Sequence, residues 1–550
     1  MSRRRSGHKD GPVGLTSPPL PHWDWNVTIS QAPWWRDSVC YQIYVRSFAD
    51  GNGDGVGDLP GIESRLPYLV ELGIDSVWIT PFYTSPQKDH GYDVADYCDV
   101  DPLFGTLADF DSMLARAHDL GIRVIVDVVP NHTSSEHPWF RSALAAEPGS
   151  VDRERYVFRD GRGRGGAKPP NNWRSIFGGP AWTRVEDPQG NPGQWYLHMF
   201  DATQPDLNWW NPEVEDSFES ILRFWLGRGV DGFRIDVAHG LHKPMDLVDR
   251  KRGDVMPLPM WDQPEVHEVY RRWHKVLEEY PGDRMAVAEA WTASAESMAR
   301  YIRSDELQQA FNFHWLSAQW SASAFRRVID ETLSAVGLVE ASATWVLSNH
   351  DVVRHVTRYG GGAGGLARGK AAVFTMLGLP GSAYVYQGEE LGLEQVDVAH
   401  EHRQDPAFFR GGDEGRDGCR VPMPWAGTDP PYDFGSGQGQ PWLPQPDEWA
   451  ALTVAAQEKQ PESTLNFYRE VLATRREVTA GLGDDVTFLT TAPGTLAFAR
   501  GDGLVVMINC GSRSAKLPPE AGALVLSSGA APEGGRLAPD TAAWFRKVAG

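Results

Sequence analysis

Eight short apolar runs, separated by longer amphipathic segments, constrain the fold of this chain more than any other feature. Each run is rich in β-branched or aromatic residues and ends in polar ones, which is the pattern of a buried strand. The runs are Val39–Phe48, Ser76–Phe82, Val124–Val129, Gly232–Val237, Met285–Trp291, Ala310–Trp315, Thr344–Ser348 and Ser382–Gln387.

The segments between the runs have the periodicity of helices: Ile62–Leu72, Phe110–Leu120, Val214–Arg228, Val266–Tyr280 and Phe325–Val336. Gly73, Gly121 and Gly229 stand where helices are expected to end. Alternating strands and helices predict a parallel sheet, and eight repeats over roughly 350 residues predict an α/β TIM (β/α)8 barrel. The alternative is a doubly wound open sheet, but no GxGxxG follows the first run.

Two segments interrupt the alternation, and both ends of the chain differ from it. Residues 133–205 lack it and predict an inserted domain B after strand three, while 395–450 predict a long loop at the same end of the barrel. Residues 481–550 contain short β runs and predict a C-terminal antiparallel β-sandwich. The barrel would then span 32–132 and 206–480, preceded by a proline-rich, flexible segment 1–31.

Composition excludes several classes of function. A formal net charge of −21 argues against nucleic acid or an anionic membrane as partner. The four cysteines form no CxxC pair, so neither a zinc site nor a disulfide framework is indicated. No apolar run reaches the ~18 residues of a membrane span, and no apolar segment follows the basic residues 2–9 as it would in a signal peptide. A cytoplasmic protein is therefore expected.

Acidic residues gather where the predicted strands end. Near the end of the third, fourth and fifth runs stand Asp127, Asp236 and Glu289, and Asp351 follows the seventh run. His132, Arg234 and His350 stand close to them in the sequence. In barrel enzymes the chemistry lies at the carboxyl ends of the strands. A structural ion pair between Arg234 and Asp236 would explain those two residues alone. Four acids at equivalent positions are harder to explain by packing, because clustered like charges are unfavourable.

A carboxylate cluster without a metal-ligand set or a phosphate loop points to glycoside hydrolysis, in which one carboxylate attacks the anomeric carbon and another protonates the leaving oxygen. Asp236, beside Arg234, is expected to keep a low pKa and act as nucleophile. Glu289, flanked by Ala288, Ala290 and Trp291, is expected to have a raised pKa suited to general acid/base work. Asp351 would stabilise the oxocarbenium charge.

In order and spacing, these four blocks resemble the signature regions of the α-amylase family of retaining glycoside hydrolases. The resemblance covers about 34–480 and places domain B where that family carries it. It implies Asp236 as nucleophile, Glu289 as acid/base and Asp351 as transition-state stabiliser. It also implies that the subsite for the transferred glucose is lined by Asp127, His132, Phe177, Arg234 and His350.

Finer motifs resemble the oligo-1,6-glucosidase/α-glucosidase branch, especially α-glucosidases of the actinobacterial type. Gln204-Pro-Asp-Leu-Asn208 resembles that branch's additional motif. In His90-Gly-Tyr92-Asp93, the resemblance implies that Tyr92 stacks on the terminal glucose and that Asp93 binds its outer hydroxyls. Arg420, in Arg420-Val-Pro-Met-Pro-Trp425, would pair with Asp93 and close the pocket, which makes the enzyme exo-acting.

One loop predicts a metal. Oxygen ligands recur at alternate positions in Asp50, Asn52, Asp54, Val56 and Asp58, as they do in calcium loops. The loop lacks the closing Glu of an EF-hand, so a calcium sensor is not indicated. The resemblance implies a structural Ca²⁺ or Mg²⁺ ion after strand one, whereas an Asn/Asp/Gly turn without metal is the alternative.

The expected activity is release of α-glucose from non-reducing ends of short gluco-oligosaccharides, with transglucosylation as a side reaction. Val237, after the nucleophile, points to α-1,6 linkages, but Ala238-His239-Gly240-Leu241 resembles enzymes acting on maltose, and α-1,4 is favoured. Trehalose synthase is a rival. A non-catalytic transport or scaffold subunit would lack the carboxylates or carry a membrane segment. A monomer or homodimer with a small sugar substrate is expected.

Overall fold

Eight parallel strands form the central sheet of the molecule. The computed structural model describes residues 32–186, 190–255, 258–411, 414–435, 437 and 439–548, so the predicted flexible segment 1–31 lies outside the described residues. The strands are β1 (Val39–Ile43), β2 (Ser76–Ile79), β5 (Arg123–Val128), β9 (Gly232–Ile235), β10 (Met285–Ala288), β11 (Gln309–Ala310), β12 (Thr344–Val346) and β13 (Ser382–Tyr386).

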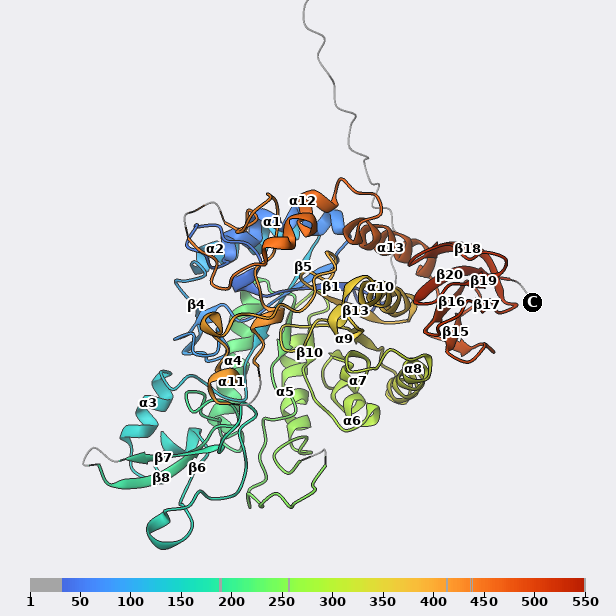
Figure 1. Ribbon diagram of the computed structural model, residues 1–550. Helices are drawn as coiled ribbons and strands as arrows, with labels where there is room; N and C mark the ends of the chain where they lie inside the picture. Colours follow the sequence, from blue (N-terminus) through green and yellow to red (C-terminus); the bar gives the residue numbers. More distant parts are fainter. Residues whose placement is uncertain are drawn as a thin grey trace, which may run out of the picture. The chain divides into compact units, whose positions relative to one another are not determined.

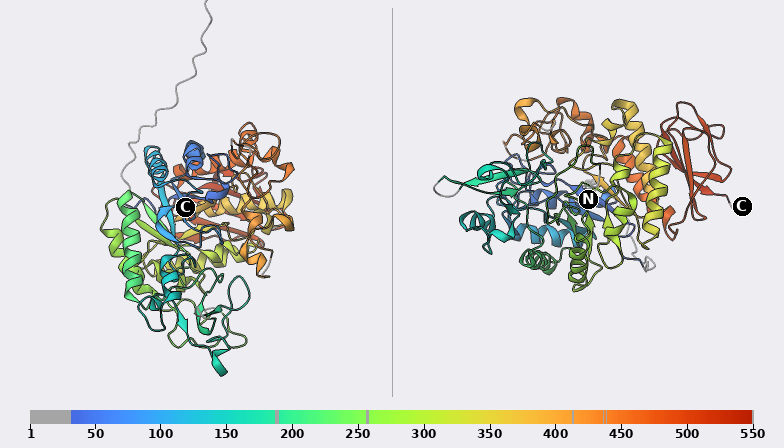
Figure 2. Two further views of the ribbon diagram at one scale, coloured as in Figure 1. Left: turned by 90° about the vertical axis from the view of Figure 1, so that its left-hand side faces the viewer. Right: turned by 90° about the horizontal axis from the view of Figure 1, so that it is seen from below.

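These strands pair in the order β11-β10-β9-β5-β2-β1-β13-β12. A parallel bridge between Phe311 and Thr344 joins the two outer strands, so the sheet closes. Helices surround it (Figures 1 and 2). The predicted TIM barrel is confirmed.

The main helices follow the predicted segments closely. They are α1 (Leu59–Leu72), α2 (Leu107–Asp119), α4 (Pro212–Arg228), α5 (Val266–Glu278), α8 (Ala322–Gly337), α10 (Gly362–Gly378) and α13 (Thr464–Thr479). Gly73 and Gly229 end α1 and α4 with φ of 95° and 106°, a left-handed conformation that glycine adopts without strain.

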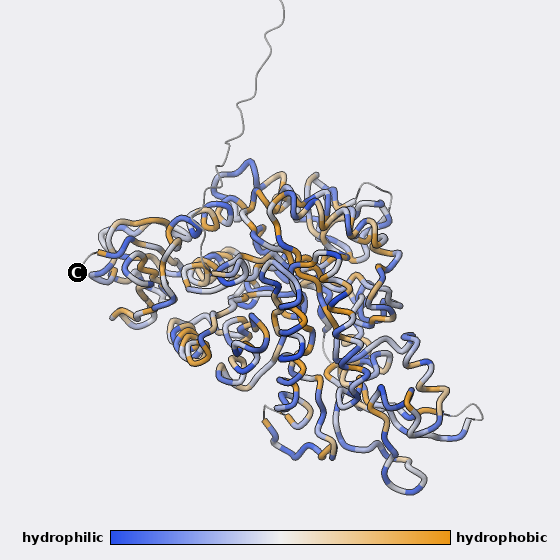
Figure 3. Tube along the Cα trace, turned by 180° about the vertical axis from the view of Figure 1, so that it is seen from behind, coloured by the Kyte–Doolittle hydropathy of each residue, from blue (hydrophilic) through white to orange (hydrophobic). Residues whose placement is uncertain are grey.

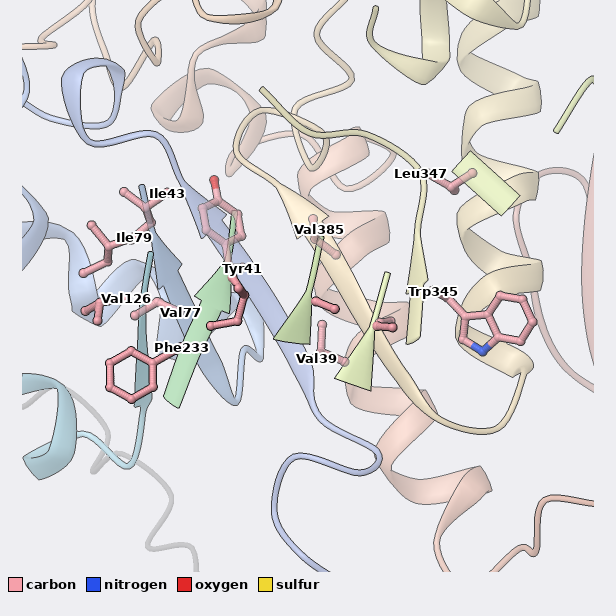
Figure 4. Close-up of a cluster of buried hydrophobic side chains, with 14 of the residues drawn as sticks. Val39, Tyr41, Ile43, Val77, Ile79, Val126, Phe233, Trp345, Leu347 and Val385 are labelled. Carbon is pink, nitrogen blue, oxygen red and sulfur yellow. The ribbon is translucent and has the colours of Figure 1, made fainter. Parts of the chain in front are cut away.

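Successive strand residues point alternately outward and inward, which divides the core into two layers. Outward residues such as Val39, Tyr41, Val77 and Phe233 pack with the surrounding helices (Figure 4). The hydrophobic segments accordingly gather along the central strands (Figure 3). The inward layer contains Cys40, Trp78, Ile125, Met285, Val287, Phe311, Val346 and Tyr384.

The sixth predicted strand is largely wrong. Only Gln309–Ala310 is a strand, and Phe313–Leu316 forms the short helix α7. Asn312 begins that helix because its side-chain oxygen accepts a hydrogen bond from the amide of Trp315 at 2.9 Å. A short apolar run is compatible with a buried strand or a buried helix turn, and the capping residue decides here.

The insertion after β5 has its own small antiparallel sheet. It contains α3 (Pro138–Ala145) and the antiparallel strands β6 (Phe158–Arg159), β7 (Trp182–Glu186) and β8 (Pro192–Leu197). In Figure 1 it extends below the barrel, in teal. Its backbone meets the segment that re-enters the barrel through bridges from His132 to Asp206 and from Tyr156 to Leu207. Domain B therefore lies beside the end of β5, where Asp127 is located.

The C-terminal region contains a second, antiparallel sheet. Its strands are β14 (Val486–Phe488), β15 (Thr495–Arg500), β16 (Leu504–Asn509), β18 (Ala521–Ser527) and β20 (Thr541–Lys547), and a small pair, β17 (Ala515–Lys516) and β19 (Arg536–Leu537), packs on one face. The other face packs on α10 (Figure 1), where the ring of Trp544 lies 4.4 Å from that of Phe374. The predicted C-terminal β domain is confirmed.

Candidate active site

Strand register brings three carboxylates onto one arginine. Asp127 of β5 is the register partner of Arg234 of β9, and Asp236 points inward like Arg234 because it is two residues further on. Nη1 of Arg234 donates to Asp127 at 3.0 Å and to Asp236 at 2.5 Å, and Nη2 lies 3.4 Å from Glu289. The guanidinium is buried, so these ion pairs are shielded from solvent.

Glu289, at the end of β10, is held by two further donors. Its Oε2 accepts from the amide of Val237 at 2.7 Å and its Oε1 from Nε1 of Trp291 at 2.8 Å. Val237 has a φ of 46°, which is rare for a β-branched residue. The chain therefore turns sharply directly after Asp236, and this turn brings an amide to the neighbouring carboxylate.

Two aromatic residues hold the carboxylate of Asp127 in place. Its Oδ2 accepts from the hydroxyl of Tyr92 at 3.0 Å and from Nε1 of Trp78 at 3.1 Å. The ring of Tyr92 stacks on His350, with centroids 5.3 Å apart and planes 8° apart. Nε2 of His132 lies 3.0 Å from the carbonyl of Tyr92. Burial lowers the pKa of His132 to about 4 and that of His350 well below its usual value, so both rings are neutral hydrogen-bonding groups near pH 7.

The electrostatics of the nucleophile differ from the sequence prediction. Burial raises the pKa of Asp236 well above its ordinary value, and this outweighs the opposing effect of Arg234. The expected low pKa is therefore wrong, because burial of the carboxyl prevails over Arg234 and the charges of Glu289 and Asp127 add to the rise. Burial also raises the pKa of Glu289, and the charge of Asp351 adds to the rise, as predicted for a general acid.

A second cluster, here called the loop cluster, contains Asp89, Asp351, Asp405, Arg416 and Arg420. Arg416 reaches Asp351 at 3.0 Å, Asp89 at 2.7 Å and Asp405 at 2.7 Å, and Arg420 reaches Asp351 at 2.9 Å. Although burial alone would raise it, His350 and the two arginines hold the pKa of Asp351 far below its usual range. Asp351 is thus the permanently charged acid of the site.

The predicted pairing of Asp93 with Arg420 is wrong. The carboxylate of Asp93 turns back into its own loop and accepts from the hydroxyl of Ser85 and the amides of Lys88 and Asp89. Arg420 is fully buried and donates to the carbonyl of His350 at 2.8 Å. The pair that spans the two loops is Asp89 with Arg416.

The acids Asp236, Glu289 and Asp351 line one cavity of about 520 Å³ together with Asp89 and Arg416 of the loop cluster. Its lining residues are Asp89, Tyr92, His132, Ile176, Phe177, Phe200, Asp236, Val237, His239, Leu258, Trp261, Glu289, Trp291, His350, Asp351, Ala407 and Arg416. The guanidinium of Arg416 lies 4.9 Å from the ring centroid of Phe177, which comes from domain B. The cavity has the size and mixed lining of a small-molecule site.

A sequence model of the α-amylase catalytic domain matches residues 42–481. The chain belongs to the α-amylase family. Membership agrees with the barrel, with the insertion after its third strand and with the acids at its strand ends. The protein is therefore a glycoside hydrolase.

Relatives within the α-amylase family are similar over most of their length. A probable α-glucosidase of Rhizobium meliloti (strain 1021) is 40% identical over 496 residues, which are 86% of this chain and 87% of the relative. An oligo-1,6-glucosidase of Heyndrickxia coagulans is 35% identical and shares 80% of this chain and 85% of its own. The crystal structure of an α-glucosyl transfer enzyme superposes with a TM-score of 0.85 at 38% identity, covering 94% of this chain and 100% of the other.

Sequence reasoning missed Asp89, Arg416, His239 and Trp261 of this family member. Asp89 directly precedes the motif that supplied Asp93, and Arg416 lies just before the motif that supplied Arg420, so each loop offers two residues of the same type and only loop conformation decides between them. None of the described helices has the length and apolar content needed to cross a membrane.

Proposed function

We propose that the protein is an exo-acting, retaining α-glucosidase that releases α-glucose from short α-gluco-oligosaccharides. The observation that carries the proposal is the contact of Arg416 with both Asp89 and Asp351, because Asp351 is also one of the acids at the strand ends. Arg416 binds Asp89 and Asp351 together, which places charged hydrogen-bonding groups in the cavity lining next to Asp351. Such groups suit the hydroxyls of one terminal glucosyl unit.

In the proposed mechanism, protonated Glu289 donates its proton to the glycosidic oxygen while Asp236 attacks the anomeric carbon. The bond to the leaving sugar breaks and a glucosyl ester with Asp236 forms. Water, or a sugar hydroxyl, then loses a proton to Glu289 and displaces Asp236. Both carboxylates lie within 3.4 Å of the guanidinium of Arg234, and the retaining mechanism requires their carboxyl groups to be ~5–5.5 Å apart. The charge of Asp351 stabilises the oxocarbenium-like transition state.

Within this proposal, α-1,4 linkages such as that of maltose are the favoured substrates. The sequence after the nucleophile and the similarity to the Rhizobium α-glucosidase support this choice. Val237, which lines the cavity, supports oligo-1,6-glucosidase activity as the second candidate. Other relatives are named trehalose-6-phosphate hydrolase and trehalulose synthase. The test therefore also includes hydrolysis of other disaccharides and isomerisation to other disaccharides as outcomes.

Initial rates on maltose, isomaltose, sucrose, trehalose and maltotriose distinguish these candidates when free glucose and transfer products are both quantified. The proposal predicts the highest kcat/KM on maltose or maltotriose, with α-glucose as the first product anomer by NMR. A preference for isomaltose would select the second candidate. Release of β-glucose would contradict the retaining mechanism.

We also propose that the loop from Asp50 to Asp58 binds a structural Ca²⁺ or Mg²⁺ ion. Three carboxylates, one amide oxygen and the carbonyl of Val56 are hard oxygens of the kind that these ions prefer, although the side chains of the described residues do not gather into a ready-made metal-binding group. The loop is folded on its own oxygens: Asp50 accepts from the amides of Gly53 and Gly55, and Asp58 from those of Gly51, Asn52 and Gly61. Burial raises the pKa of Asp58, and the charge of Asp50 adds to it, so a cation there would relieve repulsion. The ion would rigidify the loop after β1 and take no part in bond cleavage.

A further inference from the structure

One histidine of the cavity lies between two groups that make opposite demands on its proton. Nε2 of His132 lies 3.0 Å from the carbonyl oxygen of Tyr92, which only accepts hydrogen bonds, and 3.2 Å from the side-chain nitrogen of Gln204, which only donates them. The side-chain oxygen of Gln204 accepts from the amide of Asp201 at 3.0 Å, so the orientation of that side chain is fixed. This side of the ring therefore leaves open which nitrogen of His132 carries the proton.

The other side of the ring faces Asn131. Nδ2 of Asn131 lies 3.1 Å from Nδ1 of His132, and Oδ1 of Asn131 accepts from Nζ of Lys243 at 2.7 Å. An ammonium group has only donors, so the oxygen of Asn131 must face Lys243 and its nitrogen must face the imidazole. Nδ1 of His132 is then an acceptor. The proton consequently lies on Nε2, which donates it to the carbonyl of Tyr92.

The side chain of Lys243 is itself held in place. Nζ lies 2.9 Å from Oδ2 of Asp206 and donates to the carbonyl of Gly240, and the residue is only 4% exposed. Glycine permits this approach, because a Cβ at Gly240 would lie 2.7 Å from the ring of Trp261 and 3.1 Å from Oδ1 of Asn131. Burial lowers the pKa of Lys243, but Asp206 opposes this change. The ammonium group thus has a fixed position from which it orients the amide.

The proton on Nε2 matters to the active site because of the groups that Tyr92 contacts. The hydroxyl of Tyr92 donates to Asp127 at 3.0 Å, and Asp127 shares Arg234 with Asp236. Without its proton, Nε2 of His132 would direct a lone pair at the carbonyl of Tyr92. The repulsion would displace the main chain that carries the ring, and with it the donor to Asp127.

The ring of His132 has only one proton to place near pH 7. Burial lowers the pKa of His132 to about 4, the charge of Asp206 opposes this change and the charge of Lys243 adds to it. Asp89 lies behind Gln204, whose side-chain nitrogen it accepts from at 2.9 Å. The neutral ring therefore exists as one of two tautomers, and its neighbours select between them.

We propose that Asn131 is a positioning residue whose amide, oriented by Lys243, places the proton of His132 on Nε2. That proton then holds the main chain of Tyr92 beside the catalytic acids. The kinetic consequence rests on the proposed function, whereas the position of the proton can be measured without it.

Substitution Asn131→Asp tests the proposal, because it keeps the shape of the side chain and replaces the donor that faces Nδ1 by an acceptor. The proton should move to Nδ1, and kcat/KM for maltose at neutral pH should fall by about 10- to 30-fold as the bond to Tyr92 is lost. The added carboxylate also raises the pKa of His132. As the pH falls through that higher pKa, the ring gains a second proton and Nε2 donates again. The ratio of variant to wild-type kcat/KM should therefore recover in acid.

Asn208→Asp is the matched control. Asn208 is also buried and lies in the segment that returns from domain B, where its nitrogen donates to the carbonyl of Glu154 at 2.8 Å. The substitution adds the same charge, but Asn208 has no hydrogen bond to His132 among the described residues. Any loss of activity in this variant should stay constant with pH.

The ¹⁵N NMR signals of the histidine rings report the proton directly, with His132 assigned from the spectrum of His132→Gln. The proposal predicts a protonated Nε2 in the wild type and a protonated Nδ1 in Asn131→Asp at neutral pH. A proton on Nδ1 in the wild type, or a defect in Asn131→Asp that does not change with pH, would overturn it. If the wild type cleaves neither maltose nor an aryl α-glucoside, the proposed function fails, and the NMR signals still decide the position of the proton.

Discussion

Strand β9 has an aspartate before its first residue and another after its last, and the two are held in opposite ways. Asp231 accepts from the amide of Val124 at 2.9 Å and from Arg123, Arg284 and His118 at 2.7–3.0 Å. Among the described side chains, Asp236 has one hydrogen-bond donor, Arg234, which it shares with Asp127. Both carboxylates are buried.

The difference in partners changes the direction of the pKa shift. Burial raises the pKa of Asp231, but its donors together bring it below the ordinary value. For Asp236, burial prevails and the pKa rises. A fully satisfied carboxylate at the amino end of a barrel strand stabilises the fold, whereas an incompletely satisfied one at the carboxyl end is available for chemistry.

The largest expected effect is the loss of turnover in Asp236→Asn, or in Glu289→Gln. Each removes a group that forms or breaks a bond, so kcat for maltose falls by at least about 10³-fold. In Asp236→Asn the thermal unfolding midpoint stays the same or rises, because a poorly satisfied buried charge is removed. Initial rates and thermal unfolding of the same samples provide the measurement, and substantial residual turnover would refute the assignment.

Asp231→Asn should have the opposite effect: it should lower stability and leave turnover nearly unchanged. Breaking this buried network lowers the free energy of unfolding by about 3 kcal/mol, while kcat of the folded enzyme stays within about 3-fold. The pKa of Asp231 is depressed on folding, so its contribution is present above the unfolded value near 3.9 and is lost as pH falls through the folded value. The difference in unfolding midpoint between wild type and variant should therefore shrink below about pH 4. A difference that persists in acid would contradict this origin.

The loop cluster allows a similar contrast between Asp89 and Asp93. Asp89→Ala removes the partner of Arg416 in the cavity, so kcat/KM for maltose should fall about 100-fold with little change in the unfolding midpoint. Asp93→Ala removes acceptors of the loop's own amides, so its main effect should be a lower midpoint. Initial rates and thermal unfolding of both variants distinguish the two roles. A purely kinetic defect in Asp93→Ala would instead support the predicted pairing of Asp93 with Arg420.

A smaller effect is expected at Trp291. Its Nε1 donates to the ionised form of Glu289 and so lowers the pKa of that group. Trp291→Phe keeps a ring to stack on Phe313 but removes the donor. The pKa of Glu289 then rises, it stays protonated to higher pH, and the alkaline limb of kcat/KM moves up by about half a unit. A shift to lower pH in the rate profile would contradict this geometry.

Chelation should have the smallest effect. If the loop from Asp50 to Asp58 holds a cation, EDTA lowers the unfolding midpoint by a few degrees, and added Ca²⁺ or Mg²⁺ restores it through linkage, with kcat nearly unchanged. Asp54→Ala should remove the response to metal. Scanning calorimetry with and without each ion makes the measurement, and an unchanged midpoint would favour a metal-free turn.

The strand-end site could be predicted because strands have a fixed period. Arg234 and Asp236 share a face by being two residues apart, and parallel register brings Asp127 beside them. No such periodicity governs the positions of residues in the loop cluster. Asp89 and Arg416 come from loops more than 300 residues apart, and side-chain capping inside one loop removes Asp93 from the cavity. The sixth strand failed for a related reason, since Asn312 begins a helix within an apolar run.

The pKa of Asp236 also lay beyond sequence reasoning, because it depends on how deeply the carboxyl is buried and on which acids lie beside it around Arg234. His239 shows the same limit. Its position after the nucleophile was visible, but its contact with Trp261 depends on how the chain folds.

The most direct test of the account is to trap the covalent intermediate. A fluorinated α-glucosyl fluoride that forms the ester faster than the ester hydrolyses should inactivate the enzyme, with fluoride released as the carbon–oxygen bond forms. Peptide mass spectrometry should then find one fluoroglucosyl unit on Asp236, and none in Asp236→Asn. Label on Asp351 or Glu289 instead, or rapid turnover to the inverted sugar without any label, would contradict the assignment of Asp236 as the nucleophile.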